Sequence, residues 1–153
     1  MKNIWVVLLT IFLPSTAFSQ EEFDFVVIGS ACKMIVSYNV VSDESLKVTD
    51  ADTPILFCNR NSKIITCNVT HAEELDKQEK RVYKLEMDSP PILFFQTDNG
   101  SDSAYINIRN NTGSYSSRIL GKQFMGQKVC SSLFLTYNQY NLMMKKQLGA
   151  ESN

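Results

Sequence analysis

The clearest pattern along the chain is an alternation of apolar and polar residues with a period of two. It is longest at 32–40, and shorter stretches recur at 65–69, 83–87, 104–108 and 129–137. Residues two apart on a β-strand point to the same face, so this pattern is typical of half-buried strands.

Further β-prone runs occupy 23–28, 46–48, 55–58, 91–95 and 114–120. Gly29 and Ser30 are placed to form a turn or bulge after the first of these runs. The run 91–95 is apolar throughout, as expected for a strand covered on both faces. With turn residues at intervals of roughly ten, the pattern predicts a mainly β protein, an antiparallel sandwich or barrel of about eight to ten short strands.

Two segments break the strand pattern. The charged segment 70–80 has capping-box spacing at Thr70 and Glu73, and we interpret it as a solvated loop or a helical turn or two. In 138–148, apolar residues recur every four positions, which predicts a short C-terminal helix. Asn138 is the expected N-cap, and 149–153 is the expected frayed tail.

The first nineteen residues have the pattern of a signal peptide. Lys2 precedes an apolar run at 4–13, and the small residues Ala17 and Ser19 stand before Gln20 at a cleavage position. The apolar run is about half the roughly 20 residues that a membrane span needs. We therefore expect residues 1–19 to be removed, leaving 20–153 as a single secreted or periplasmic domain with no membrane span.

The four cysteines all follow the predicted cleavage position. An even number behind a signal peptide favours disulfides, and four cysteines allow three connectivities. Cys58 and Cys67 flank a turn-like segment and would face each other in a hairpin, which would leave Cys32 to pair with Cys130. No C-x-x-C pair occurs, so a zinc site or a redox dithiol is disfavoured.

The net charge and the motifs of the sequence limit the classes of function that it fits. The formal net charge is −1 and no basic patch occurs, so a nucleic-acid partner is not expected. The single histidine, His71, lies beside Glu73, Glu74 and Asp76, which we interpret as a solvated charged face rather than a metal site. No nucleophile or phosphate-loop motif occurs, and we expect no metal and no cofactor.

The aromatic residues are either core or the lining of a ligand cavity, and we favour core. Tyr105, Tyr115 and Arg118 are the candidates for an exposed binding face, with Arg118 on the same serine-rich strand as Tyr115. Three sequons make Asn68, Asn99 and Asn110 candidate glycosylation sites in an organism that glycosylates secreted proteins.

The hypothesis that best fits these features is a non-enzymatic protein that binds another protein or a cell-surface component through a sheet face or edge. One alternative is a carrier of a small ligand, with aromatic residues lining a barrel cavity. The other is a small hydrolase that uses a pair of carboxylates.

Overall fold

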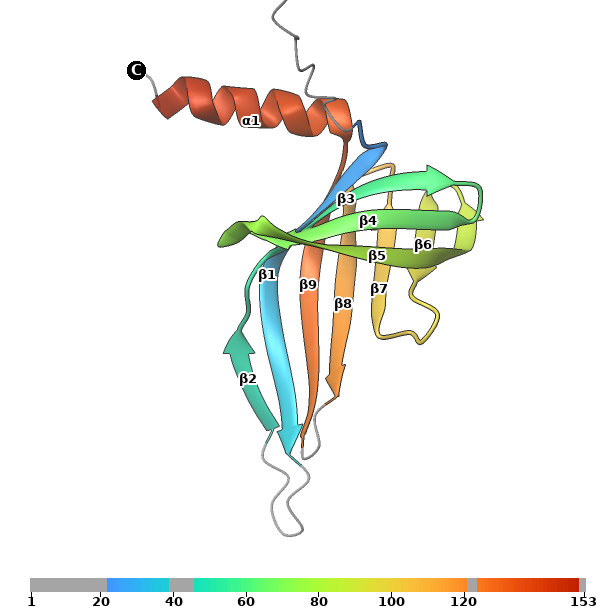
Figure 1. Cartoon of the computed structure of the whole chain (residues 1–153), viewed down its shortest axis with the longest axis vertical. Helices are drawn as coiled ribbons and strands as arrows, with labels where there is room; N and C mark the ends of the chain where they lie inside the picture. Colours follow the sequence, from blue (N-terminus) through green and yellow to red (C-terminus); the bar gives the residue numbers. More distant parts are fainter. Residues whose placement is uncertain (1–21, 39–45, 121–123, 152–153) are drawn as a thin grey trace, which may run out of the picture.

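The computed structural model describes residues 22–38, 46–120 and 124–151, so the predicted signal peptide lies outside the described residues. The described chain contains nine β-strands followed by one helix (Figure 1). In chain order the elements are β1 (Phe25–Tyr38), β2 (Leu46–Asp50), β3 (Pro54–Asn61), β4 (Ile64–His71), β5 (Glu74–Ser89), β6 (Ile92–Gln96), β7 (Asp102–Asn107), β8 (Thr112–Leu120), β9 (Phe124–Thr136) and α1 (Tyr137–Glu151).

The strands form a closed antiparallel barrel. The order β1-β3-β4-β5-β6-β7-β8-β9 closes because β9 pairs with β1, and β2 is an extra strand on the far half of β1. The predicted mainly β fold with a short C-terminal helix is therefore confirmed. Of the two predicted architectures, a sandwich and a barrel, the structure has the barrel. Residues 25–28 of β1 pair with β3 and residues 33–37 with β2, so β1 serves both the barrel and an extension of its wall (Figure 1).

A bulge in β1 separates these two halves. Ala31 has a positive φ of 47°, and the register against β9 shifts between Ser30 and Lys33. The sequence placed the break at Gly29 and Ser30, but β1 continues through it as one strand. A bulge bends a strand and increases its twist, which lets the far half of β1 leave the barrel wall.

The barrel interior is filled with inward-facing side chains. Phe95 packs against Phe25 at 6.1 Å and against Tyr83 at 5.3 Å between ring centroids. Phe95 and Tyr83 are fully buried, as are Leu56 and Ile106 on facing strands. Most aromatic residues that face the barrel interior therefore belong to its packed core. A barrel of eight strands is usually filled by side chains in this way.

Two disulfides tie the barrel wall, which confirms the disulfide prediction. Cys58 lies directly opposite Cys67 in the β3–β4 hairpin and is bonded to it, and Cys32 on β1 is bonded to Cys130 on β9. This is the pairing that the hairpin spacing favoured. Disulfides of this kind are typical of an oxidising compartment.

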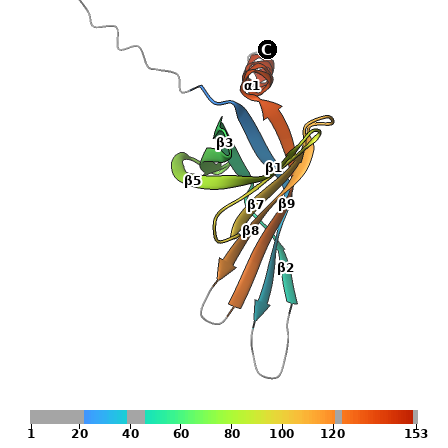
Figure 2. The ribbon, with the colours of Figure 1, turned by 90° about the vertical axis from the view of Figure 1, so that its right-hand side faces the viewer.

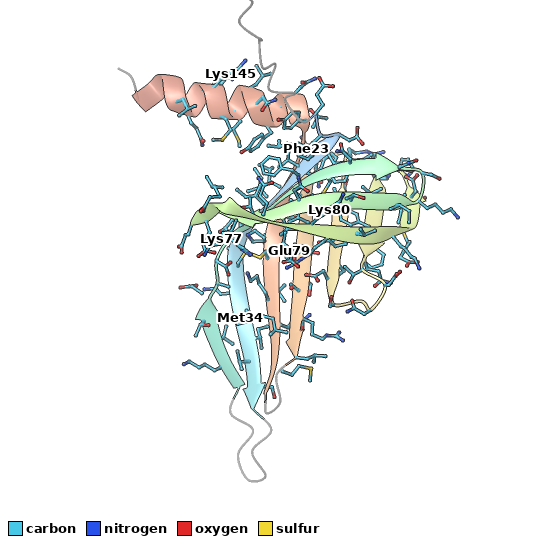
Figure 3. All side chains as sticks on the ribbon, in the orientation of Figure 1. Phe23, Met34, Lys77, Glu79, Lys80 and Lys145 are labelled. Atoms are coloured by element: carbon cyan, nitrogen blue, oxygen red, sulfur yellow. A yellow bond between two sulfur atoms is a disulfide. The ribbon has the colours of Figure 1, made fainter. Side chains whose placement is uncertain are left out.

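The interpretation of segment 70–80 as a loop or helical turn is wrong. β4 continues to His71, and after a turn at Ala72 and Glu73 the chain enters β5, the longest strand described. β5 pairs with β6 only from Lys84 onward, so residues 74–83 have one edge without a neighbouring strand in the described part of the chain. Charged side chains on a free edge oppose pairing with other chains, which explains the composition of this segment (Figure 3).

The C-terminal helix α1 begins earlier and ends later than the sequence indicated. Its N-cap is Thr136 and not Asn138: Gln139 N donates to Thr136 Oγ1 at 3.3 Å, and Thr136 N donates to Gln139 Oε1 at 2.9 Å. This is a capping box, which outcompetes a single cap residue. The helix also continues through Gly149 to Glu151, where a frayed tail was expected.

The first turn of α1 attaches the helix to the barrel. Tyr137 packs on Phe23 at 5.4 Å and Tyr140 on Phe57 at 5.3 Å between ring centroids. Phe23 lies at the junction between helix and barrel (Figure 3), and the rest of α1 extends away from it (Figure 1), whereas Figure 2 views the helix along its axis. Among the described residues, no helix is both long and apolar enough to cross a bilayer.

Candidate ligand-binding site

The two ends of the barrel are built from different turns because neighbouring strands run in opposite directions. The α1 end carries the β3–β4, β5–β6 and β7–β8 turns, the start of β1 and the end of β9. The opposite end carries the β4–β5 turn and the β6–β7 loop. One hollow lies at the α1 end and a second lies between β5 and the β6–β7 loop, and the two hollows differ in chemistry.

The hollow at the α1 end, which we call the mouth cavity, has a volume of about 570 Å³. Its lining combines apolar side chains with a few charged ones: Asp24, Phe25, Arg60, Ser62, Asp88, Pro90, Ile92, Leu93, Ile108 and Phe134. These ten residues come from five separate segments of the chain, and only the closure of the barrel brings them together.

The floor of the mouth cavity is apolar and continuous with the core. Phe25 is 6% exposed and Leu93 is 7% exposed. Phe25 packs on Phe134 at 5.4 Å between ring centroids, and on its other side it packs on Phe95 in the core. Ile108, which is 41% exposed, extends this apolar surface to the solvent. An apolar ligand would therefore meet a rigid aromatic floor.

The rim of the mouth cavity carries three charged side chains. The Arg60 guanidinium forms an ion pair with Asp88, and Arg60 Nε donates to the carbonyl oxygen of Ser62 at 3.1 Å. The backbone N–H of Arg60 donates to Asp24 Oδ2 at 2.6 Å, and Asp24 N donates to Asn59 Oδ1 at 3.1 Å. These bonds fix the start of β1 against the β3–β4 turn, so the rim is held in place before any ligand arrives.

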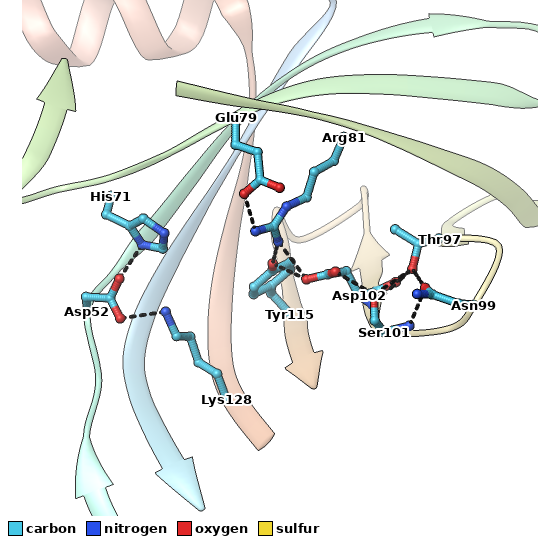
Figure 4. A network of polar contacts seen from close by, with 10 residues as sticks. All are labelled: Asp52, His71, Glu79, Arg81, Thr97, Asn99, Ser101, Asp102, Tyr115 and Lys128. Carbon is cyan, nitrogen blue, oxygen red and sulfur yellow. Dashed lines mark hydrogen bonds and ion pairs between the residues drawn. The ribbon is translucent and has the colours of Figure 1, made fainter. Parts of the chain in front are cut away.

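A polar network lies towards the opposite end of the barrel, centred on Arg81 (Figure 4). Arg81 Nη2 lies 2.7 Å from Glu79 Oε2, and Arg81 Nη1 lies 2.7 Å from Asp102 Oδ1. Arg81 Nη1 also donates to the Tyr115 hydroxyl at 3.1 Å, and that hydroxyl donates to Asp102 Oδ1 at 2.9 Å. Each group that carries charge here has a partner of opposite sign.

Burial and hydrogen bonds shift the pKa values of several groups around Arg81. The hydrogen bond from Arg81 is the main cause of a lowered pKa at Glu79. Burial raises the pKa of Tyr83 to about 12 and also raises that of Tyr115, with help from the charge of Asp102. These shifts keep Glu79 charged and both tyrosines protonated at neutral pH.

Beside this network lies the second hollow, which we call the polar hollow, with a volume of about 560 Å³. Glu79, Asp98 and Asp102 line it. Glu79 and Asp102 meet at Arg81, so carboxylates do converge as the hydrolase alternative requires. A glycosidase needs one of its two carboxyl groups to be protonated, with a raised pKa. Arg81 binds both carboxylates and the pKa of Glu79 is lowered, so this pair does not support the hydrolase alternative.

His71 belongs to a separate cluster near the polar network (Figure 4). Asp52 forms ion pairs with Lys128, whose side chain is 8% exposed, and with His71 when the imidazole is protonated. Burial disfavours the charge on Asp52, but the hydrogen bond and charge of Lys128 more than offset this and lower its pKa. His71 at the end of β4 lies directly opposite Glu74 at the start of β5.

The three predicted binding residues do not form one exposed face. Tyr115 is 2% exposed and points into the barrel, whereas Arg118 is exposed and Tyr105 is 45% exposed on the outer face. Tyr115 and Arg118 are three residues apart on β8, and an odd separation places side chains on opposite faces of a strand. The prediction of Tyr115 as part of an exposed face is wrong for this reason.

The sequon residues lie on the outside of the barrel wall or in turns. Asn99 and Asn110 are exposed in the β6–β7 loop and the β7–β8 turn, and Asn68 is half-buried on β4. Asn110 Oδ1 accepts a hydrogen bond from the Thr112 hydroxyl of its own sequon at 2.7 Å. Glycosylation of the three sites stays a prediction.

Searches of protein-family models, curated proteins and solved structures found no match for this chain.

Sequence reasoning identified only part of the mouth cavity. Phe134 was among the aromatic residues considered for a cavity, but Phe25, Leu93 and the charged rim were not singled out. The Arg60–Asp88 pair joins residues 28 positions apart across two turns, and no spacing rule connects them. The only feature of the sequence that pointed to a cavity was the high number of aromatic residues in the strands next to turns.

Proposed function

We propose that this protein is a non-enzymatic binding protein that holds a small, largely apolar molecule in the mouth cavity. The observation that carries the proposal is an apolar floor of Phe25, Leu93 and Phe134, open to solvent at one end of a closed barrel. Ligand sites are commonly concave, mostly apolar and provided with a few placed polar groups, and the mouths of β-barrels are a frequent location for them.

The size of the cavity supports a small ligand at the mouth rather than one enclosed in the barrel. Its volume of about 570 Å³ lies within the range of roughly 300–1,000 Å³ found for ligand pockets. Further inside, Tyr83 and Phe95 are fully buried and close the way into the barrel. A ligand would rest on the Phe25 ring and leave one end at the charged rim.

The hypothesis of a protein or cell-surface partner stays a prediction. The surface that would serve it is the outer face of the barrel extension, where Val48 is 55% exposed and Met125 is 51% exposed, with Ile35 on the strand between them. Apolar side chains are common on the surfaces of monomeric proteins. A concave cavity with a buried aromatic floor is the more specific feature, so we give it priority.

We infer that binding takes place outside the cytosol, in a secreted or periplasmic setting. The two disulfides support an oxidising compartment, and the signal-peptide pattern at residues 1–19 supports export. A carrier in such a compartment would move an apolar molecule through water that does not dissolve it.

The proposal is tested by titrating the purified, oxidised protein with the neutral fluorescent probe N-phenyl-naphthylamine. We expect saturable binding of one probe per chain with enhanced fluorescence. The variant Ile108→Gln should weaken binding about tenfold, which corresponds to about 1.4 kcal/mol, because it places an amide in the apolar lining.

The matched control is Ile64→Gln, because Ile64 and Ile108 are both 41% exposed but Ile64 lines the polar hollow and not the mouth cavity. It should leave the affinity unchanged, and circular dichroism should show that both variants are folded. Absence of saturable binding, or equal loss in the two variants, would contradict the mouth cavity as the site.

A further inference from the structure

We propose that the ligand of the mouth cavity is an amphiphile with a cationic, amine-type group, and that Asp24 is the residue that recognises this group. The inference rests on the proposed function and adds the chemical class of the ligand. The observation behind it is that two of the three charged rim side chains form an ion pair with each other, whereas the third, Asp24, forms none with any described residue.

The rim has a surplus negative charge that is located on Asp24. Arg60 and Asp88 neutralise each other in an ion pair, and Arg60 Nε is also occupied by the carbonyl oxygen of Ser62. The Asp24 carboxylate accepts its hydrogen bond from the backbone N–H of Arg60, which carries no formal charge. Among the ion pairs of the described residues, none includes Asp24.

The position of Asp24 suits a ligand with one charged end. Asp24 directly precedes Phe25 and both line the mouth cavity, so a polar group and an aromatic floor are adjacent. A ligand whose apolar body lies on Phe25 and Phe134 would bring its end group to the Asp24 carboxylate. The hydrogen bond from Arg60 N holds that carboxylate in place, which reduces the entropy lost on binding.

An anionic end group would fit the same rim less well. To reach the Arg60 guanidinium it would have to displace Asp88 and would lie close to Asp24, a second negative charge. Lys63 and Arg109 stand on neighbouring turns but do not belong to the lining, so among the described residues Asp24 is the lining charge without an ion pair that a bound end group would contact directly. The net negative charge of the lining residues therefore favours a cationic end group over an anionic one.

The test compares three ligands that share one alkyl chain and differ only in the end group: decylamine, decanol and decanoate. Each displaces N-phenyl-naphthylamine from the unaltered protein at neutral pH and low salt. We expect decylammonium to bind about fivefold more tightly than decanol, as for an exposed ion pair, and decanoate to bind more weakly than decanol. Because salt screens such a pair, the preference for the amine should shrink at high salt.

Substitutions then locate the effect. Asp24→Asn keeps an oxygen that can accept from Arg60 N, and it should bring decylamine to the affinity of decanol. Asp98→Asn is the matched control, since Asp98 is an exposed carboxylate that lines the polar hollow, and it should leave the preference intact. Asp88→Asn frees Arg60 from its partner and should improve the binding of decanoate.

The outcomes separate this inference from the proposed function. Failure of all three ligands and the probe to bind would contradict the proposed function itself. Equal affinity for decylamine and decanol, or an amine preference that survives Asp24→Asn, would overturn the role of Asp24 and leave the mouth cavity as an apolar site. The comparison of decylamine with decanol and its salt dependence need no substitution, so they test the preference for a cation even if Asp24→Asn does not fold.

Discussion

Arg81 Nη1 lies 2.7 Å from Asp102 Oδ1, and this ion pair joins two strands, β5 and β7, that are not neighbours in the sheet. It does so where β5 has no backbone partner on that side in the described chain, because β6 pairs with β5 only from Lys84 onward. Tyr115 on β8 completes the link through Asp102 (Figure 4). Side-chain hydrogen bonds thus hold the barrel wall where the backbone ladder is interrupted.

Removing Arg81 should therefore destabilise the fold. Arg81→Met leaves Asp102, whose side chain is 10% exposed, without its cation. Loss of one partner of a fully buried pair costs about 3–5 kcal/mol, and we expect about 2 kcal/mol here because Arg81 is 22% exposed. Urea unfolding measures the change.

The matched control for Arg81→Met is Lys84→Met, which removes the exposed Lys84–Asp98 pair on the same strand. Exposed ion pairs contribute little, so its cost should stay below about 1 kcal/mol. Equal costs for the two variants would show that the Arg81 network does not hold β5 in place.

Two buried tyrosines should respond differently to loss of their hydroxyl groups. The Tyr115 hydroxyl bonds with Asp102 and Arg81, so Tyr115→Phe should cost about 1–2 kcal/mol in free energy of unfolding. The Tyr83 hydroxyl is buried and has no hydrogen-bond partner among the described residues, so Tyr83→Phe should be neutral or stabilising. Guanidinium unfolding of both variants tests this, and a larger cost for Tyr83→Phe would contradict the assigned hydrogen bonds.

The raised pKa of Tyr83 predicts that the free energy of unfolding falls at alkaline pH. The pKa of Tyr83 is raised from 10.0 to about 12, so the unfolded chain loses this proton first. Its contribution is present in full below pH 10 and is lost as the pH rises from 10 to about 12. Tyr83→Phe should flatten this part of the stability–pH curve, which urea unfolding at a series of pH values across this range measures.

The two disulfides should contribute unequally to stability. Cys32 and Cys130 are 98 residues apart, whereas Cys58 and Cys67 are 9 apart. Loop-closure entropy gives about 4.7 kcal/mol for a loop near 100 residues and roughly 2–3 kcal/mol for a short one. Replacing both cysteines of the long-range pair by alanine should therefore cost about 2 kcal/mol more than the same change in the hairpin pair. Thermal unfolding compares the two double variants, and the reverse order would contradict this entropic account.

Gly113 is required by a close approach between strands. A Cβ atom at this position would lie 2.2 Å from the backbone oxygen of Tyr105, which neither strand can avoid without moving. Gly113→Ala should therefore cost about 2–3 kcal/mol. In contrast, a Cβ at Gly149 in α1 meets no atom within 4 Å, and Gly149→Ala should be neutral or stabilise by about 0.5–1 kcal/mol. Thermal melts of the two variants should shift in opposite directions or differ by at least several degrees.

Local sequence patterns were sufficient to predict most strands of the fold. The alternation at 65–69 and 83–87 lies within β4 and β5, that at 104–108 overlaps β7 up to Asn107, and the paired positions of Cys58 and Cys67 followed from the turn between them. These predictions succeed because alternation and hairpin turns depend on residues close in sequence. Segment 70–80 was misread because its composition describes a free edge, and a strand is at an edge only by virtue of where its neighbours end.

The sequence by itself determined a mainly β chain with four cysteines, a candidate leader and a short terminal helix, since each depends on local order. Only the tertiary structure decided that the sheet closes into a barrel, that Tyr115 points inward, and that Asp24, Arg60 and Phe134 meet at one mouth. The physical reason is the pairing of β1 with β9, residues about a hundred positions apart, whose register places every side chain on the inner or the outer face. The candidate site exists because of that one long-range pairing.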